Sequence, residues 1–214
     1  MIGTLQRDLE SIFAKVPVVA MLVIDDVKDA VPLARALVTG GLPVLEIALT
    51  TAAALDAIKA IVAEVEGVVV GSGMALTPLH LRQSRKAGCV YAASSGSTGR
   101  LLGAAEDEAM ALLPGAATAS EAMALLEWGY PLQSFFPAEL AGGRAHLASL
   151  AAALPMIKFC PTGSITMALA PSYLKLPNVT TIGGSWLAPK ALVAEAQWGS
   201  IERMAREAAA LRAL

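Results

Sequence analysis

The sequence predicts an α/β protein folded as a single (β/α)8 TIM barrel. Short apolar runs alternate with Ala/Leu-rich stretches of helical period, eight times along the chain. The apolar runs are nearly continuous, as the strands of a parallel sheet covered by helices require. Eight right-handed strand–helix units with short connections close into a barrel. A doubly wound open sheet is the alternative architecture for the same pattern.

The first half of the chain holds four strand–helix units. The strands are expected at 16–24, 42–49, 67–73 and 89–94, which are rich in Val, Ile, Leu and Ala. Helices are expected to follow them at 27–41, 51–67, 77–88 and 98–109. Glycine adopts the left-handed conformation that ends many helices. It stands at the expected helix ends, at Gly40, Gly41, Gly67 and Gly88.

The second half repeats the pattern four more times. The strands are expected at 110–115, 132–137, 156–163 and 179–186. The helices are expected at 117–129, which ends at Gly129, at 142–154, at 165–176 and from about 188 to the end. The length of 214 residues is short for a barrel, and no Pro/Ser-rich linker interrupts the chain. Residues 1–214 are therefore expected to form one domain.

The composition excludes several classes of protein. The chain is 56% hydrophobic with a mean hydropathy of +0.60, so it can bury a large core and is not intrinsically disordered. Only 16% of the residues are charged, against the usual ~25%. Much of the chain must therefore be hidden, in a core or between subunits. The net charge of −2 and the pI of about 5.7 predict no basic face and no nucleic-acid partner.

The two cysteines and the apolar runs indicate a soluble cytoplasmic protein. Cys89 and Cys160 are far apart, and two thiols make neither a disulfide framework nor a zinc site, so free thiols in a core are expected. No apolar run reaches the ~20 residues of a membrane-spanning helix. The first residues, MIGTLQRDLESIF, contain acidic residues and do not resemble a signal peptide. We therefore expect no membrane partner.

The ends of the predicted strands resemble the 2-keto-3-deoxy-6-phosphogluconate (KDPG) aldolase family. The segments that carry the resemblance are GGLPVLEIALTT, VVVGSGMAL, SFFPAE, FCPTG and IGGSWL, in this order and spacing. The resemblance covers essentially the whole chain. It implies a class I aldolase on a homotrimeric barrel, which cleaves a phosphorylated keto-deoxy sugar acid into pyruvate and glyceraldehyde 3-phosphate. It further implies a Schiff-base lysine on strand six and a proton-moving glutamate on strand two.

Several residues depart from the family pattern at the strand ends. The strand-six motif K-x-F-P-A-E begins here with Ser134, which has no amine and cannot form an imine. The strand-two motif E-x-T-x-R-T keeps Glu46 but has Thr50 in place of the arginine. Four further replacements stand at Ala20, Met74, Ser95 and Ser164. Because these changes cluster at the barrel mouth, they predict a deliberately remodelled pocket, and hence an engineered variant with a redesigned active site.

The resemblance and the alternation of strand side chains give a list of candidate site residues. The active site of a barrel lies at the C-terminal ends of its strands. Glu46, which points inward in the family, and Ser134 are the catalytic candidates. The other predicted pocket residues are Ala20, Thr50, Met74, Ala93, Ser95, Phe136, Lys158 and Thr162. A remnant of a phosphate site is predicted at Gly163, Ser164, Gly184 and Ser185, since barrels often bind phosphate after their last two strands. Neither a metal nor a cofactor is expected.

Each catalytic candidate has alternative roles. Loss of the lysine and the arginine, with apolar Met74 and Ala93 nearby, should desolvate Glu46, raise its pKa and make it a general base near neutral pH. Alternatively Glu46 persists from the parent fold and pairs with Lys158. Ser134 acts as a hydrogen-bond donor to an oxyanion, as a nucleophile, or only fills space.

Other groups that could take part are poorly placed for it. Both histidines, His80 and His146, fall on predicted outer helices, so neither is expected to activate a nucleophilic serine. Lys158 is a candidate for a Schiff base, but its expected position toward the barrel floor argues against access.

Three functions remain open. The first is an enzyme with a remodelled pocket, in which Glu46 drives proton abstraction or hydrolysis on a small apolar substrate and Ser134 assists. The second is a small-molecule binding protein, and the third is an inactivated trimeric assembly scaffold. Because several pocket positions change together, the pattern favours the first two. Aldol cleavage through an imine is not expected without the lysine.

Overall fold

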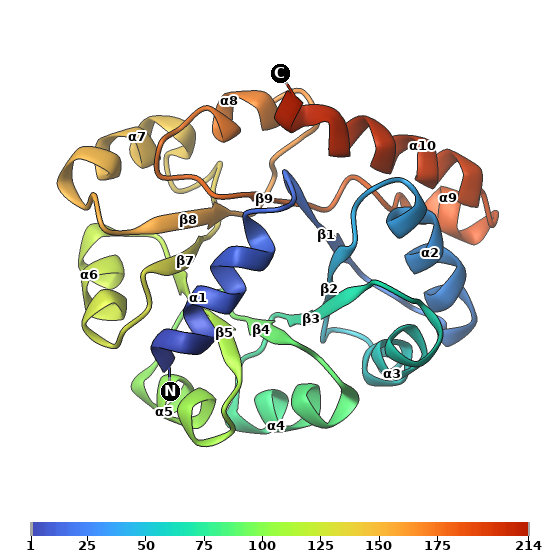
Figure 1. The fold of residues 1–214 in the computed structure, drawn as a ribbon, viewed down its shortest axis with the longest axis horizontal. Helices are drawn as coiled ribbons and strands as arrows, with labels where there is room; N and C mark the ends of the chain where they lie inside the picture. The colour runs from blue at the N-terminus through green and yellow to red at the C-terminus, as the bar shows by residue number, and fades with distance from the viewer. Residues whose placement is uncertain (1, 214) are drawn as a thin grey trace.

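The protein is an α/β fold of parallel strands surrounded by helices (Figure 1). A computed structural model describes residues 2–213. The first sheet has the order β5-β4-β3-β2-β1-β9 and the second β6-β7-β8, and all their pairings are parallel. The strands are β1 (Val18–Leu22), β2 (Val44–Ala48), β3 (Val69–Gly73), β4 (Tyr91–Ala93), β5 (Ala111–Leu113), β6 (Gly115–Ala116), β7 (Leu132–Phe135), β8 (Lys158–Pro161) and β9 (Ile182–Gly184).

The two sheets adjoin at both of their ends. β5 and β6 are successive pieces of one extended stretch, and Pro114, which has no N–H to donate to a ladder, stands between them. The Ser94 N–H donates to the Leu113 carbonyl (3.1 Å), and the Ser134 N–H donates to the Pro114 carbonyl (2.9 Å). At the other end, a parallel bridge joins Phe159 of β8 to Val179, just before β9. The single strand predicted at 110–115 is therefore two short strands in two sheets.

The helices lie outside the strands in Figure 1, except for α1. The predicted helices up to residue 154 are confirmed with shifts of a few residues at their ends. The helix bounds are α1 (Ile2–Phe13), α2 (Val27–Thr39), α3 (Ala54–Glu64), α4 (Pro78–Ala87), α5 (Gly99–Asp107), α6 (Ala119–Glu127), α7 (Gly143–Ala153), α8 (Ala170–Leu174), α9 (Lys190–Ala194) and α10 (Trp198–Ala209), followed by a 3-10 turn (Ala210–Ala213).

Local capping explains where the helices begin and end. The Thr77 hydroxyl accepts from the His80 N–H at the start of α4, which ends at Gly88 with a left-handed φ of 97°. At the start of α6, the Thr118 hydroxyl and the Glu121 carboxylate bond each other's backbone N–H groups in a capping box. These contacts hold the helices that flank the ends of β3 and β5–β6, and so they position the loops around the strand ends.

Two predicted helices differ in the structure. The helix expected at 165–176 is reduced to α8, because Pro171 can stand only in the first turn of a helix. The helix expected from about 188 is divided into α9 and α10 by Ala196, which has a left-handed φ of 50°.

Helix α1 was not predicted, and it packs across the strands at the end opposite the loops that carry the candidate site. Leu9 and Phe13 of this helix join an inner apolar cluster with residues from the strands. The Phe13 ring meets the Tyr91 ring edge-on, with centroids 5.2 Å apart. The Gln6 amide donates to the Leu112 carbonyl (2.7 Å). The interior between the strands is thus filled at this end.

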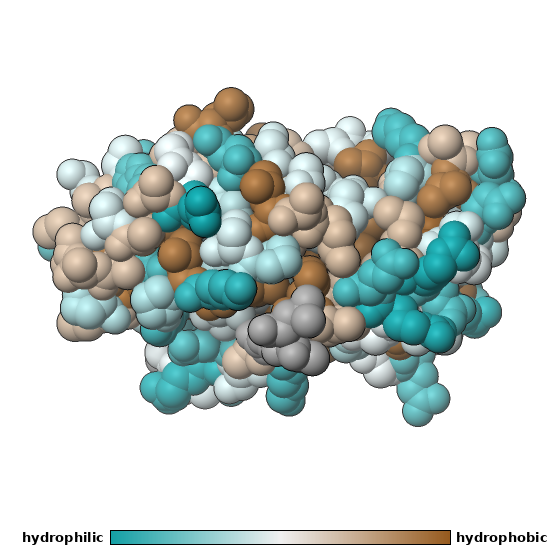
Figure 2. All heavy atoms as spheres, turned by 90° about the horizontal axis from the view of Figure 1, so that it is seen from above, coloured by the Kyte–Doolittle hydropathy of each residue, from teal (hydrophilic) through white to brown (hydrophobic). Residues whose placement is uncertain are grey.

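The rest of the core lies between the strands and the outer helices, and it takes in alternate strand residues such as Val18, Ala20 and Leu22 of β1. Cys89 and Cys160 are buried free thiols, as predicted. On the side drawn in Figure 2, apolar residues lie interspersed with polar ones. Within residues 2–213, the helices are too short or too polar to cross a membrane.

Candidate active site

A pocket of about 90 Å³ lies at the carboxyl ends of the central strands. Its walls come from both sheets, so segments far apart in the sequence meet there. It is lined by Met21, Glu46, Met74, Ala93, Ser94, Ser95, Ser134, Phe136 and Thr162. The structure therefore brings together Glu46, Ser134 and five of the other predicted pocket residues. Met21 and Ser94 were not predicted.

Glu46 is a buried carboxyl group with little to compensate its charge. β2 places it between Met21 of β1 and Gly71 of β3 in the parallel register. Its side chain is only 5% exposed. Burial raises the pKa of Glu46 to about 8. None of the residues that line the pocket is a lysine, an arginine or a histidine. At neutral pH the carboxyl group is therefore mostly protonated, and it becomes a base of useful strength just above neutrality.

Two further ionisable groups are buried close to Glu46. Burial, and then the negative charge of Glu46, raise the pKa values of Tyr91 and Cys160 well above their ordinary values. The Tyr91 ring lies against Gly71, where a Cβ atom would collide with it. Both groups stay neutral across the physiological range, so they offer Glu46 no positive charge. They extend the apolar surroundings of the carboxyl group toward α1.

Ser134 is buried in β7, and its hydroxyl faces that of Thr162. The two oxygen atoms, Ser134 Oγ and Thr162 Oγ1, lie 3.3 Å apart, and either can donate. The histidines are engaged elsewhere: His80 Nδ1 accepts from the Leu76 N–H (3.2 Å), and His146 Nδ1 lies 2.9 Å from the Ala141 carbonyl. The pocket thus offers Ser134 a hydroxyl partner and no imidazole base.

Three predicted pocket residues lie outside the pocket. Ala20 is fully buried against the helical layer, because the inward residues of β1 are Val19 and Met21. Thr50 is exposed in the turn after β2. Lys158 begins β8, and its Nζ atom donates to the Pro177 carbonyl (2.8 Å). Lys158 is therefore turned away from Glu46, and the predicted ion pair between them is absent among the described contacts.

The predicted phosphate-site residues border the same end of the strands but do not line the pocket. Gly163 and Ser164 both have a left-handed φ, of 105° and 59°. Gly184 is buried in β9 against Val18, whereas Ser185 after it is exposed. Ser164 thus occupies a backbone conformation that favours glycine.

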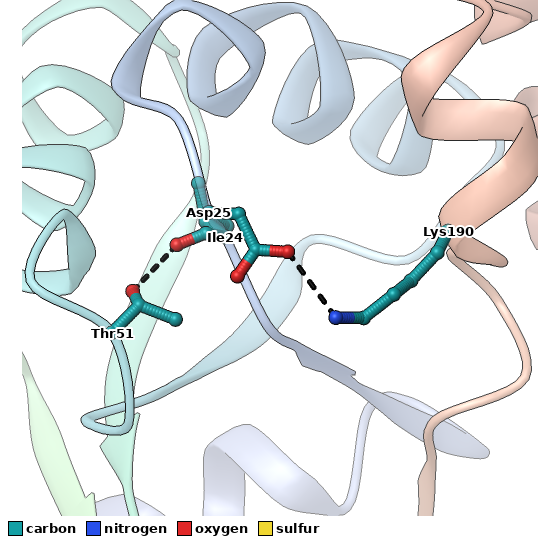
Figure 3. Close-up of polar contacts among 4 residues, drawn as sticks. All are labelled: Ile24, Asp25, Thr51 and Lys190. Atoms are coloured by element: carbon teal, nitrogen blue, oxygen red, sulfur yellow. Dashed lines mark hydrogen bonds and ion pairs between the residues drawn. The ribbon is translucent and has the colours of Figure 1, made fainter.

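Contacts at the rim tie neighbouring loops together (Figure 3). The Thr51 hydroxyl donates to the Ile24 carbonyl (2.6 Å), which links the loops after β2 and β1. Lys190 Nζ, at the start of α9, lies 3.2 Å from the Asp25 carboxylate. A second pocket of about 140 Å³ lies beside this pair, between the loop after β1 and α9. Of its charged groups, Asp25 and Lys190 are exposed and Asp29 is half-buried, so it lacks the fully buried polar side chain that distinguishes the pocket at Glu46.

No cluster of three or more His, Cys, Asp or Glu side chains suited to a metal ion occurs within residues 2–213. The chemistry available from these residues is that of a buried carboxyl group, several hydroxyl groups and apolar walls. Such a pocket can bind a small molecule and move a proton to or from it.

Parallel strands within a ring of helices, with a small pocket at their carboxyl ends, define the class of protein as an α/β fold with an enzyme-type site. The particular family follows from comparison with known proteins. The family model described as KDPG and KHG aldolase matches residues 9–204. The chain belongs to this aldolase family and has its class I scaffold.

Relatives of known name agree with this assignment. The 2-dehydro-3-deoxy-phosphogluconate aldolase of Pseudoalteromonas atlantica is 44% identical over 94% of this chain and 94% of that protein. The KHG/KDPG aldolase of Escherichia coli K12 is 43% identical over 93% of each chain.

Solved structures agree as well. The Zymomonas mobilis ZM4 KDPG aldolase with 3-phosphoglycerate gives a TM-score of 0.90 at 44% identity, over 96% of this chain and 97% of that one. The Legionella pneumophila KDPG aldolase, with pyruvate captured as a covalent carbinolamine, gives 0.91 at 37% identity, over 94% and 97%.

Proposed function

We propose that this member of the aldolase family has lost imine chemistry and uses Glu46 as a general base on a small, largely apolar substrate. The observation that carries the proposal is the environment of Glu46, a buried carboxyl group in an accessible pocket that has no cationic residue in its lining. A carboxylate whose pKa lies near the working pH combines a useful population of the basic form with good proton affinity. Proton abstraction is therefore the reaction class that the pocket supports best.

The loss of the imine route follows from the missing amine. A covalent carbinolamine of the kind described for the Legionella protein needs a primary amine to attack the keto group. Ser134 stands at the position that the family motif gives to that lysine. Lys158 lies at the start of β8, with its amine on the Pro177 carbonyl, and it does not line the pocket. We infer that no lysine of the chain replaces the missing group.

Ser134 is proposed to act as a hydrogen-bond donor rather than as a nucleophile. A nucleophilic serine needs a base in hydrogen-bond contact, and the described partner of its hydroxyl is Thr162. A hydroxyl held by a second hydroxyl can instead donate to oxygen that becomes negatively charged as Glu46 removes a proton. Thr162 would then position Ser134.

Binding without chemistry is the second candidate function. Met21, Met74, Ala93 and Phe136 make much of the pocket lining apolar, which suits an apolar ligand whether or not it reacts. A silenced assembly scaffold is less well supported, because it needs no such pocket.

Several broader features belong to the same proposal. We infer that the two sheets act as one closed (β/α)8 barrel, that residues 1–214 are one domain, and that the chain forms a homotrimer in the cytoplasm, as the family resemblance implies. We also infer that the clustered replacements at the mouth are the result of engineering. Light scattering would test the trimer through its mass.

A pH–rate profile tests the proposed chemistry. The substrates are an activated carbon acid and an activated ester, each with the unaltered chain, Glu46→Gln, Ser134→Ala and the surface control Glu66→Gln. We expect the rate of proton abstraction to rise with pH, with an apparent pKa near 8. The rate should be lost in Glu46→Gln and unchanged in Glu66→Gln. Equal rates in all four proteins would mean that the pocket is not catalytic, and binding would remain as the function. An acyl burst lost only in Ser134→Ala would identify a serine hydrolase instead.

A further inference from the structure

The Glu46 carboxyl group is an unpartnered polar group that faces a pocket. Its side chain is 5% exposed and lines the cavity, and among the described residues no hydrogen bond or ion pair compensates it. A buried carboxylate without a partner is costly, whereas one that is paired and hydrogen-bonded is tolerated. A ligand that supplies a positive charge would remove this cost.

We propose that the pocket binds a small primary organic ammonium ion, with the Glu46 carboxylate as its counter-ion. The inference rests on the proposed function in one respect, because both need the ionised form of Glu46 to face the pocket. It adds the chemical class of a ligand, which a general-base role does not specify.

The remaining walls suit such a cation. An ammonium group has three N–H donors. One points at the Glu46 carboxylate, and the hydroxyl oxygens of Ser134 and Thr162 lie in the same pocket and can accept the other two. Phe136 and Met74 line the same pocket and can contact the alkyl part of the ligand, and an aromatic ring or a thioether is compatible with a nearby cation.

The size of the pocket limits the ligand. A cavity of about 150 Å³ holds benzene, and this pocket measures about 90 Å³. Ethylammonium therefore fits, whereas an aromatic ammonium ion such as benzylammonium does not fit entirely inside. Selectivity for the short cation is part of the inference.

Binding should release a proton. The free carboxyl group is mostly protonated at pH 7, since burial raises the pKa of Glu46 to about 8. The ionisable groups that face it are Tyr91 from β4 and Cys160 from β8, and both have pKa values raised far above neutrality. Only Glu46 titrates among the residues that line the pocket, so affinity should rise about tenfold from pH 6 to 7 and about fivefold from pH 7 to 8, where half of the carboxyl groups are already ionised.

Isothermal calorimetry with ethylammonium chloride tests the inference. Titrations at pH 6, 7 and 8, in two buffers of different ionisation enthalpy, give the affinity and the number of protons released. Ethanol is the neutral control ligand, benzylammonium the size control, and Glu46→Gln and Glu66→Gln the paired variants. We expect ethylammonium binding with proton release in the unaltered chain and in Glu66→Gln, and at least a tenfold loss in Glu46→Gln.

The outcomes separate this inference from the proposed function. If ethanol binds as tightly as ethylammonium, or if Glu46→Gln binds the cation unchanged, the inference is wrong. If the carbon-acid rate depends on Glu46 but ethylammonium neither binds nor inhibits, the general base stands and the cation site is overturned. If ethylammonium binds through Glu46 and the rate does not depend on Glu46, the cation site stands and the general base is overturned.

Discussion

Gly73 lies directly against the carboxyl group of Glu46. A Cβ atom built on Gly73 would be 2.5 Å from Glu46 Oε1, and 3.0 Å from its Cγ atom. The missing side chain on β3 is therefore what leaves room for the Glu46 side chain of β2, since the two strands are neighbours in the sheet. The position of the acid thus depends on the absence of a side chain at Gly73.

Gly73→Ala should displace the Glu46 carboxyl group and reduce proton abstraction by about 100-fold, because a misplacement of about 1 Å costs that much. Overpacking at this buried position should also lower the free energy of unfolding by about 1–3 kcal/mol. The measurements are the carbon-acid rate and urea unfolding at pH 8.

Gly103→Ala is the matched control for that substitution. A Cβ atom at Gly103 meets nothing within 4 Å, and the residue lies inside α5. Alanine there should raise the free energy of unfolding by roughly 0.5–1 kcal/mol and leave the rate unchanged. Equal rates for both alanine variants would show that the carboxyl group does not need its present position.

The stability of the protein should fall as the pH rises from about 4.5 to about 8. The pKa of Glu46 is raised from 4.5 to about 8 on folding, so between these values the folded chain holds a proton that the unfolded chain has lost. The stabilisation is fully present below pH 4.5 and is lost through pH 8. It corresponds to about 5 kcal/mol over the whole range.

Urea unfolding of the unaltered chain and of Glu46→Gln, at several pH values, measures this effect. The difference between the two should change in favour of Glu46→Gln as the pH rises, because glutamine does not ionise. A constant difference from pH 5 to pH 9 would mean that the folded and unfolded states hold the Glu46 proton equally.

Ser134→Ala should reduce proton abstraction by about 100- to 1,000-fold, the range for removal of one donor to a developing oxyanion. The apparent pKa in the rate profile should stay near 8, because Glu46 is unchanged.

Thr162→Val is the companion variant. If Thr162 positions the serine hydroxyl, its loss should lower the rate less than the loss of Ser134 does. A larger effect of Thr162→Val would make threonine the donor.

Ser134→Lys should restore an amine beside Glu46. The positive charge would lower the pKa of the Glu46 carboxyl group, so the rate profile should move to lower pH. Treatment with pyruvate and borohydride should then leave a covalent adduct on residue 134, seen by mass spectrometry of the digested protein. An adduct of equal yield on the unaltered chain would mean that another lysine serves as the amine.

Ser164→Gly should stabilise the protein by about 1 kcal/mol. Ser164 is exposed and has a left-handed φ of 59°, a conformation that glycine adopts without the steric cost of a Cβ atom. The gain is read as a higher midpoint of urea unfolding. Ser185→Gly, at another exposed serine near the strand ends, is the control and should bring no gain, since Ser185 has no left-handed φ.

Much of the fold could be predicted from the alternation of apolar runs and helical stretches. The parallel strands follow from that alternation, because each run needs helices to cover it. Three details could not be predicted this way. Pro114 interrupts a strand through its missing N–H. Pro171 confines α8 to a short helix, and Ala196 divides the last helical stretch into α9 and α10. Helix α1 packs Leu9 and Phe13 into the apolar interior between the strands.

Pocket residues could be predicted on those strands where one residue was known to face inward, because the alternate residues of a strand share a face. Glu46 and Ser134 were oriented by the family motifs, and their neighbours on the same face followed. For β1, Ala20 was chosen because it departs from the family pattern, and Met21, its neighbour in the sequence and the partner of Glu46 in the register, was missed. Thr50 and Lys158 failed for other reasons. β2 ends at Ala48, so Thr50 lies in the exposed turn after the strand, and the long Lys158 side chain reaches the Pro177 carbonyl instead of the pocket.

Helix α1 has a consequence for how the acid responds to temperature. Phe13 packs on Tyr91, and Tyr91 interacts with Glu46, so the exclusion of water beneath the carboxyl group depends on α1. A single helix can open locally at a lower free-energy cost than unfolding of the whole protein. Each such opening would let water reach the Glu46 carboxyl group and return its pKa toward the ordinary value while both sheets remain folded. The apparent pKa of Glu46 should therefore fall on warming, at temperatures below the unfolding transition of the protein.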